Sequence, residues 1–173
     1  MRATLEVFAG MLITFFWTLV FSQPLLGTVK NDIEFSNRGG IPLMMDALFQ
    51  DGPGLFPSII FVHGGGFTGG DKKGYPKVIC EMLTQAGFNW FSVNYRLSPG
   101  FTFPAHTEDV ELAIAFLKTR GQEFKIDPNR IVLMGSSAGG HLVSFVGSKH
   151  KPQNRVAAVV SFYGEHDLVN RTK

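Results

Sequence analysis

Blocks of apolar residues alternate with mixed polar stretches along the chain, and the spacing inside each block predicts strands and helices in turn. Residues 58–62 are apolar after the first position and rich in β-branched side chains, which is typical of a strand buried on both faces. Residues 31–36 and 43–49 predict an early pair of strands, joined by a glycine-containing turn at 37–40. Short apolar runs predict further strands at 88–95, 131–134 and 156–162.

Helices are predicted between these strands, at 75–85, 107–119 and Ala138–Ser148. In the second helix, four apolar residues recur at positions i, i+3, i+4 and i+7, which places one apolar stripe against a sheet: Val110, Ala113, Ile114 and Leu117. The segment Asp127-Pro128-Asn129 predicts a turn. Strand–helix–strand alternation with buried strands predicts an α/β fold with a mostly parallel central sheet flanked by helices.

The N-terminal residues form a separate segment. Arg2 precedes an uncharged apolar run at 7–20, and small residues stand before a potential cleavage point at Gln23. This pattern predicts a secretory signal peptide over residues 1–22, with a domain over 23–173 that is secreted or periplasmic.

A membrane anchor through residues 7–21 is the alternative to a cleaved signal. No charged residue lies between Glu6 and Lys30, and a membrane-spanning helix needs about 20 mostly apolar residues. A stable membrane partner is expected only if this segment is retained.

Composition narrows the classes of function. The chain has 173 residues, 45% apolar and 17% charged, with a net charge of +2. This excludes a disordered chain and offers no electrostatic basis for binding nucleic acid. A single cysteine, Cys80, excludes an internal disulfide and a cysteine-rich metal site. Asp71, Asp109 and Glu111 lack metal-ligand spacing and are interpreted as solvated charges, so neither a metal nor a cofactor is expected.

The first of two glycine-rich turns directly follows the predicted strand at 58–62. It reads His63-Gly64-Gly65-Gly66-Phe67. Successive glycines leave backbone N–H groups unshielded by side chains, so this turn can direct several donors at one developing negative charge. A flexible loop or a phosphate cradle is the alternative interpretation.

The second turn, Gly135-Ser136-Ser137-Ala138-Gly139, lies between a predicted strand and a predicted helix and fits the pattern G-x-S-x-G. In that context the glycines permit a sharp turn that presents the central Ser137 hydroxyl at the carboxyl edge of the sheet. The helix N-terminus adds partial positive charge nearby. The alternative is an incidental Ser/Gly loop.

These two turns, in this order, resemble the α/β-hydrolase superfamily. Within it, the chain is similar to esterases and lipases with the His-Gly-Gly-Gly motif, related to hormone-sensitive lipase and to feruloyl and acetyl esterases. The resemblance spans residues 58–168 and includes Gly70-Asp71-Lys72, Asn94-Tyr95-Arg96-Leu97, Phe103-Pro104-Ala105, Asp127-Pro128-Asn129 and Phe162-Tyr163-Gly164.

The resemblance implies a serine hydrolase that acts on small-molecule carboxylic esters through an acyl-enzyme on Ser137. It implies that the backbone N–H groups of Gly65, Gly66 and Ala138 form the oxyanion hole. His63 and Gly64 would support the oxyanion loop rather than transfer protons.

The two glycine-rich turns do not identify a catalytic acid or a catalytic base. The fold orders its catalytic residues as Ser, then Asp or Glu, then His. Four histidines precede the expected place of the base and are interpreted as loop, capping or surface residues: His63, His106, His141 and His150. His166 and Asp167 are adjacent in sequence and point to opposite sides of an extended stretch, which disfavours a hydrogen-bonded relay.

The chain is therefore expected to be incomplete at the C-terminal edge of the sheet, with the acid and base beyond residue 173 and with negligible turnover of its own. The strand at 156–162 would then present an exposed apolar edge. The alternative function is a non-catalytic α/β-hydrolase-like binding or interaction protein. A dipeptidyl-peptidase-like enzyme is a weaker third option, because such enzymes carry a large additional domain.

Overall fold

A computed structural model of the chain describes residues 27–149 and 151–168. The predicted signal peptide or anchor and His150 lie outside the described residues. The strands are β1 (Gly27–Arg38), β2 (Ile41–Gln50), β3 (Phe56–Val62), β4 (Asn89–Val93), β5 (Ile126–Ser136) and β6 (Ala158–Phe162). The helices are α2 (Lys77–Gln85), α3 (Ala105–Thr119) and α4 (Ala138–Ser148), with short 3₁₀ turns η1 (Lys72–Gly74) and η2 (Pro152–Asn154).

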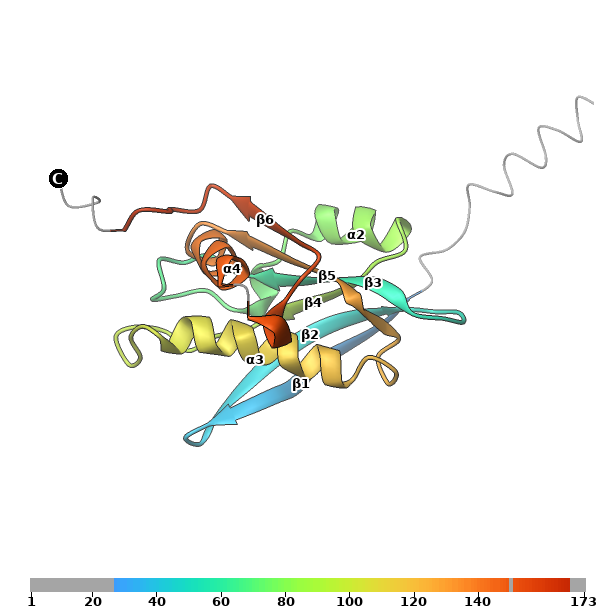
Figure 1. The fold of residues 1–173 in the computed structure, drawn as a ribbon, viewed down its shortest axis with the longest axis horizontal. Coiled ribbons are helices and arrows are strands. Elements are labelled where there is room, and N and C mark those ends of the chain that lie inside the picture. The colour runs from blue at the N-terminus through green and yellow to red at the C-terminus, as the bar shows by residue number, and fades with distance from the viewer. Residues whose placement is uncertain (1–26, 150, 169–173) are drawn as a thin grey trace, which may run out of the picture.

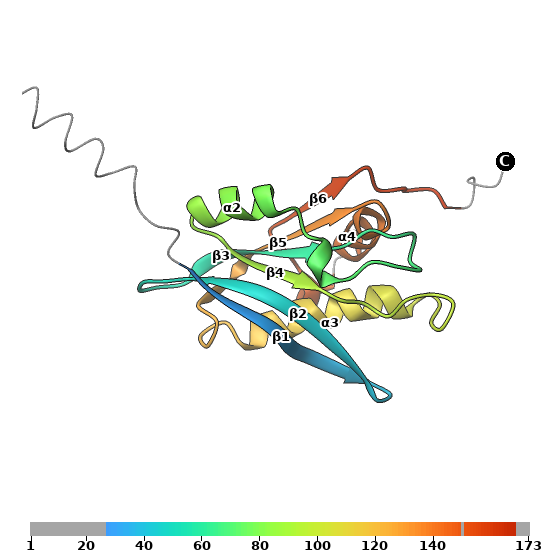
Figure 2. The same ribbon diagram turned by 180° about the vertical axis from the view of Figure 1, so that it is seen from behind.

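The six strands form one sheet in the order β1-β2-β4-β3-β5-β6. The pairs β1/β2 and β2/β4 are antiparallel, whereas β4/β3, β3/β5 and β5/β6 are parallel. Helix α2 covers one face of the sheet and α3 and α4 cover the other (Figures 1 and 2). The predicted α/β class and the mostly parallel sheet are confirmed.

Strand β5 differs from its prediction. The segment Asp127-Pro128-Asn129, expected as a turn before the strand, lies within β5. The ladder with β3 pairs Ile126 with Phe56 and then Ile131 with Ser58, so the residues between bulge out of the register. The Asn129 N–H donates to Asp127 Oδ1 at 2.9 Å, which gives the bulge a local turn.

Two apolar clusters hold the helices on the sheet. The predicted stripe of α3 is confirmed, since all four of its side chains are fully buried in the larger cluster with α4. The smaller cluster lies under α2 and includes Ile59, Phe61, Cys80, Trp90 and Met134. Burial raises the pKa of the Cys80 thiol to about 12, so this cysteine behaves as a small apolar side chain.

The interpretation of Asp109 as a solvated charge is wrong. Its side chain is 0% exposed and accepts hydrogen bonds from Arg96 Nη2 at 2.7 Å and from the Arg96 backbone N–H at 2.8 Å. Glu111 is also largely buried and shares its oxygens between Lys149 and Lys151. Asp71 is exposed, and it caps η1 by accepting from the Lys73 N–H.

Strand β6 forms one margin of the sheet. Among the described residues it pairs only with β5. Val159 and Phe162 remain 38% and 39% exposed, so this margin presents apolar side chains next to unpaired backbone groups.

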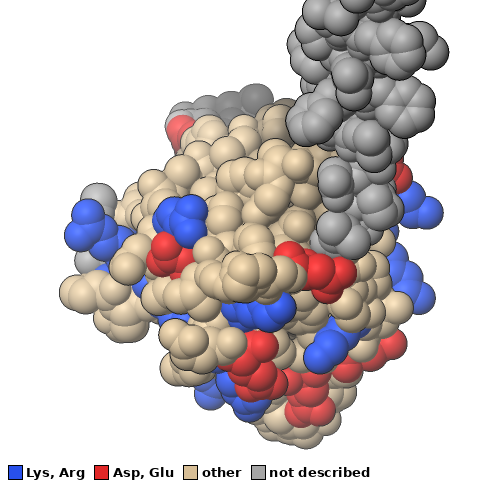
Figure 3. Space-filling model, turned by 90° about the vertical axis from the view of Figure 1, so that its right-hand side faces the viewer, with Lys and Arg blue, Asp and Glu red and all other residues tan. Residues whose placement is uncertain are grey.

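Charged side chains of both signs are intermixed on the face shown in Figure 3, mainly in the lower part of the view. That face therefore carries no extended field of one sign. Within the residues that the structure describes, no helix combines the length and apolar character needed to cross a membrane.

Candidate active site

Ser137 lies at the sharp turn between β5 and α4. Its backbone adopts φ 52° and ψ −120°, a left-handed conformation that a non-glycine residue rarely adopts and that costs about 1–3 kcal/mol. Two backbone bonds hold it there: the Ser137 N–H donates to the Phe162 carbonyl at 2.9 Å, and the His141 N–H donates to the Ser137 carbonyl at 3.0 Å. The surrounding structure thus imposes the turn that the G-x-S-x-G pattern predicts.

Gly139 allows the first turn of α4 to rest directly on the end of β3. A Cβ atom at this position would lie 2.1 Å from the Val62 carbonyl oxygen and 2.5 Å from the His63 carbonyl oxygen. Only glycine fits at this distance. The contact joins the nucleophile turn to the strand from which the first glycine-rich turn departs.

The structure brings the two glycine-rich turns together. A Cβ atom on Gly64 would lie 3.2 Å from Ser137 Cβ, so the backbone of the first turn passes directly beside the serine. Gly65 has φ +116°, and its carbonyl accepts from the N–H groups of Thr68 at 3.1 Å and Gly69 at 3.0 Å. Because C=O and N–H of a trans peptide point in opposite directions, the Gly66 N–H faces away from these bonds.

The three predicted oxyanion donors are the N–H groups of Gly65, Gly66 and Ala138. Within residues 27–149 and 151–168, no hydrogen bond uses any of them. Unused donors beside a nucleophile are what an oxyanion site requires. Their role there stays a prediction.

His63 is buried at the start of this loop rather than exposed. Its Nδ1 lies 2.7 Å from the Gly64 carbonyl, and its ring stacks on Tyr95 with centroids 4.3 Å apart. The Tyr95 hydroxyl donates to the His63 carbonyl at 3.2 Å. Burial lowers the pKa of His63 below its ordinary value, so the ring is neutral near pH 7.

This lowered pKa predicts a pH dependence of stability. Above the unfolded-state pKa of about 6.5 the contribution of neutral His63 is fully present, and it is lost as the pH falls toward the folded-state value, because the unfolded chain then binds a proton that the folded chain does not. We expect the unfolding free energy from urea titrations to decrease as the pH falls below about 6.5, and His63→Gln to flatten that slope. Exposed His166→Gln is the control; an equal flattening there would contradict the assignment.

The other histidine rings are engaged elsewhere. His106, expected as a capping or surface histidine at the start of a helix, lies in the first turn of α3 but is buried, with Nε2 3.3 Å from Ser98 Oγ. His141 places Nδ1 2.6 Å from the Glu165 carbonyl. His166 is exposed. No hydrogen bond joins the Ser137 hydroxyl to a histidine among the described residues.

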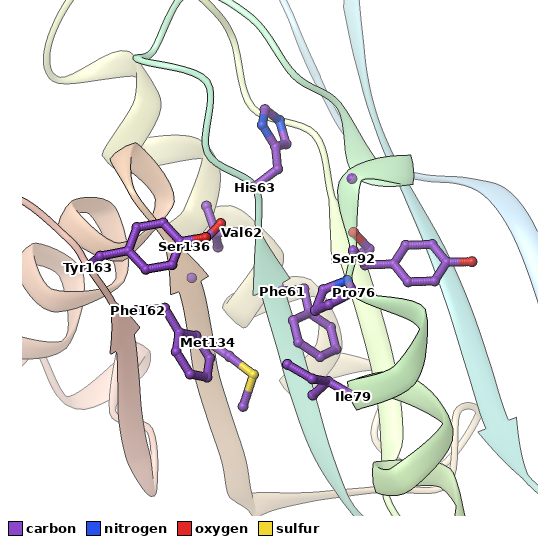
Figure 4. Close-up of a pocket in the computed structure, with 13 residues that line it drawn as sticks. Phe61, Val62, His63, Pro76, Ile79, Ser92, Met134, Ser136, Phe162 and Tyr163 are labelled. Atoms are coloured by element: carbon purple, nitrogen blue, oxygen red, sulfur yellow. The ribbon is translucent and has the colours of Figure 1, made fainter.

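A cavity of about 220 Å³ lies between α2 and the ends of β3, β5 and β6 (Figure 4). Its wall is mostly apolar, and Ser136 lines it whereas Ser137 does not. The cavity thus lies behind the nucleophile turn, on the α2 face of the sheet. Nothing in the sequence pattern pointed to it.

From the sequence, Lys72 was identified only as part of the Gly70-Asp71-Lys72 motif and had no assigned role. Lys72 is 4% exposed, and its Nζ lies 2.6 Å from Asp46 Oδ1 and 2.9 Å from Asp32 Oδ1. The available signal was the lone charge of Asp46 in an otherwise apolar strand. No group of three or more His, Cys, Asp or Glu side chains is placed to hold a metal within the part of the chain that the structure describes.

Comparisons with known proteins identify a matching family model and several curated relatives. The family model described as BD-FAE matches residues 47–173. The esterase LipC of Mycobacterium tuberculosis is 33% identical over 127 residues, an alignment that covers 67% of this chain and 32% of the relative. The chain spans about a third of the length of the first curated relatives it matches.

Solved structures show the same fold. A hyperthermophilic esterase from the archaeon Pyrobaculum calidifontis superimposes with a TM-score of 0.70 at 27% identity, over 83% of this chain and 46% of that chain. A truncated form of a carbohydrate esterase from gut microbiota gives a TM-score of 0.71 at 23% identity, over 83% of this chain and 59% of that chain.

Proposed function

Because this chain belongs to the BD-FAE family, we propose that it carries the nucleophile and the oxyanion hole of a serine hydrolase that acts on small-molecule carboxylic esters. One observation carries the proposal: Ser137, held in a left-handed turn, lies against the glycine loop whose N–H groups at Gly65 and Gly66 are unused. The named relatives and solved neighbours that are esterases support the same reaction class.

The chemistry proceeds in two acyl-transfer steps. The Ser137 oxygen attacks the ester carbonyl carbon, its hydroxyl proton passes to a base, and the carbonyl oxygen becomes an oxyanion facing the free N–H groups. The alcohol leaves with a proton, and water then hydrolyses the acyl-enzyme. One oxyanion donor contributes about 10²–10³ to the rate of such reactions.

We further propose that the base comes from outside the described residues. The rings of His63, His106 and His141 each contact other partners through a ring nitrogen. In related serine hydrolases, loss of the base leaves about 10³–10⁴ of the acceleration over water. Turnover of esters by this chain alone is accordingly expected to be very slow.

We propose that residues 1–22 act as a signal peptide, on the basis of the uncharged run at 7–20. Amino-terminal sequencing of the protein purified from the producing cell tests this. A start at Gln23 supports cleavage, whereas an intact Met1 supports an anchor.

Phosphonylation tests the nucleophile. A fluorophosphonate is attacked by the Ser137 oxygen, fluoride leaves, and a base takes the hydroxyl proton. We expect slow labelling of the chain, acceleration by added imidazole as an external base, an adduct mapped by mass spectrometry to Ser137, and none in Ser137→Ala. Ser136→Ala, one residue away, should retain it.

Other outcomes discriminate the alternatives. An adduct on a different serine contradicts the assigned nucleophile. Fast labelling without imidazole contradicts the assignment of the base to a source outside the described residues. Absence of a Ser137 adduct even with imidazole supports the non-catalytic binding protein instead.

A further inference from the structure

The loop that carries the oxyanion donors has two stems. The first stem leaves β3 at His63, where stacking on Tyr95 and the Tyr95 hydroxyl bond hold it. The second stem returns through Gly70 and Asp71 to Lys72. A Cβ atom on Gly70 would lie 2.6 Å from both the Gly64 carbonyl oxygen and His63 Nδ1, so the two stems are in direct contact.

The second stem ends at Lys72, a buried lysine that pairs with a buried carboxylate. The Lys72 side chain is 5% exposed and reaches the Asp46 carboxylate, itself 6% exposed, on β2. It also contacts the Asp32 carboxylate on β1 at 2.9 Å, but that side chain is 71% exposed. The Lys72 backbone N–H donates to Asn94 Oδ1 at 2.7 Å, next to the end of β4. Asp46 Oδ1 also accepts from the Asp32 backbone N–H at 2.9 Å, which ties in the irregular part of β1.

Between its stems the loop is also anchored at Phe67, whose ring lies edge-on to the rings of His106 and His141. Between the stems, the described contacts include Gly65 with Thr68 and Gly69, and the Ser98 N–H that donates to the Phe67 carbonyl at 2.8 Å. Gly65, Gly66 and Thr68 are exposed. A segment of this kind has low local stability unless its ends are fixed.

We propose that Lys72 is a positioning residue for the oxyanion loop: the buried Lys72–Asp46 pair fixes the second stem, and thereby holds the Gly65 and Gly66 N–H groups against Ser137. The inference rests on the proposed function for the role of those N–H groups. A hydrolase gains from this arrangement because donors set before the reaction need no reorganisation when the oxyanion forms.

Because Lys72 and Asp46 form a buried ion pair, a double replacement can remove the positioning of the loop with little effect on the overall stability of the protein. Removing one partner leaves an uncompensated charge, whereas replacing both by apolar groups of similar size is often neutral or stabilising. The double variant Lys72→Met/Asp46→Leu therefore removes the directional contact without a buried orphan charge. Lys73→Met, at the exposed neighbouring lysine, is the matched control.

The first readout is local amide exchange in the full chain. We expect the Thr68 and Gly69 amides, which donate to Gly65, to exchange about tenfold or more faster in the double variant relative to the β3 and β5 amides, and the Gly65 and Gly66 amide shifts in ¹H–¹⁵N spectra to move. Lys73→Met should leave both unchanged. If the double variant does not fold, Lys72→Arg, which keeps the charge but changes the geometry of the contact, provides the same ratio of loop to strand exchange.

The second readout is chemical. The imidazole-assisted rate of Ser137 phosphonylation should fall about tenfold or more in the double variant and stay within about twofold in Lys73→Met. Loop exchange that is unchanged, or that rises only in parallel with β3 and β5, overturns the proposal. So does faster loop exchange with an unchanged phosphonylation rate. If wild-type Ser137 forms no adduct at all, the proposed function fails, and exchange and amide shifts alone decide whether Lys72 fixes the loop.

Discussion

Replacing Gly139 by alanine is expected to remove on the order of 3 kcal/mol from the unfolding free energy, or to prevent folding. The added Cβ would lie 2.1 Å from the Val62 carbonyl oxygen, and both atoms belong to backbone that the sheet and α4 hold in place. Helix α4 would have to lift off β3, taking Ser137 with it. Urea titration followed by far-UV circular dichroism measures the loss.

Gly147→Ala is the control because it makes the same substitution in the same helix. There the close neighbour is Val159 Cγ2, at 2.5 Å from the added Cβ, at the end of a side chain that is 38% exposed and can rotate. Alanine also favours the helix over glycine by about 1 kcal/mol. We expect a change smaller than about 1 kcal/mol, and equal losses at the two positions would refute the assigned contact.

The second large effect is expected at Asp109. Asp109→Asn would leave the Arg96 guanidinium, 12% exposed, without its buried carboxylate, which is expected to cost about 3 kcal/mol. The bond from the Arg96 backbone N–H to Asp109 also joins the loop after β4 to α3, so local order there should fall as well. The same urea titration applies, with Trp90 fluorescence as a second probe.

Glu108→Gln tests whether the loss expected for Asp109→Asn comes from the burial of that carboxylate or from ion pairing with Arg96 as such. Glu108 contacts the same guanidinium at 3.3 Å and is 52% exposed. An exposed pair of this kind contributes less than about 1 kcal/mol. A loss as large as that of Asp109→Asn would show that burial does not determine the contribution of this cluster.

The helices and inner strands were predictable because the spacing of their apolar residues identifies each type of element. The stripe in α3 has the helical period, and all four residues are buried. The bounds of α4, Ala138–Ser148, coincide with the prediction because the turn before it and the polar segment after it mark both ends. The strand at 58–62 was recognised from its apolar run, and β3 extends two residues earlier.

Features that depend on a distant partner could not be predicted in this way. The bulge at Asp127 in β5 exists because the ladder with β3 continues on both sides of it. Asp109 looked solvated because nothing near it in sequence identifies Arg96, 13 positions earlier, as its partner. Lys72 and Asp46 are 26 positions apart, and only the path of the loop brings them together.

In the candidate site, too, the residue types were predictable and the contacts between distant segments were not. The motifs identified Ser137 and the glycine loop as candidates, since residue types and order suffice for that. The motifs did not show that Gly64 touches Ser137, which follows from β3 and β5 being neighbours in the sheet. The roles of Gly65, Gly66 and Ala138 stay predictions until phosphonylation and amide exchange are measured.

The adjacency of β3 and β5 also has a consequence for how the protein is made. The glycine loop leaves the ribosome well before Ser137, separated from it by α2, β4 and α3. Until β5 emerges and docks in parallel beside β3, the loop has no serine to face, and its free N–H groups are open to water. Parallel pairing across such crossovers is slow compared with local helix formation. The assembled site is therefore one of the last features of this segment to appear during biosynthesis.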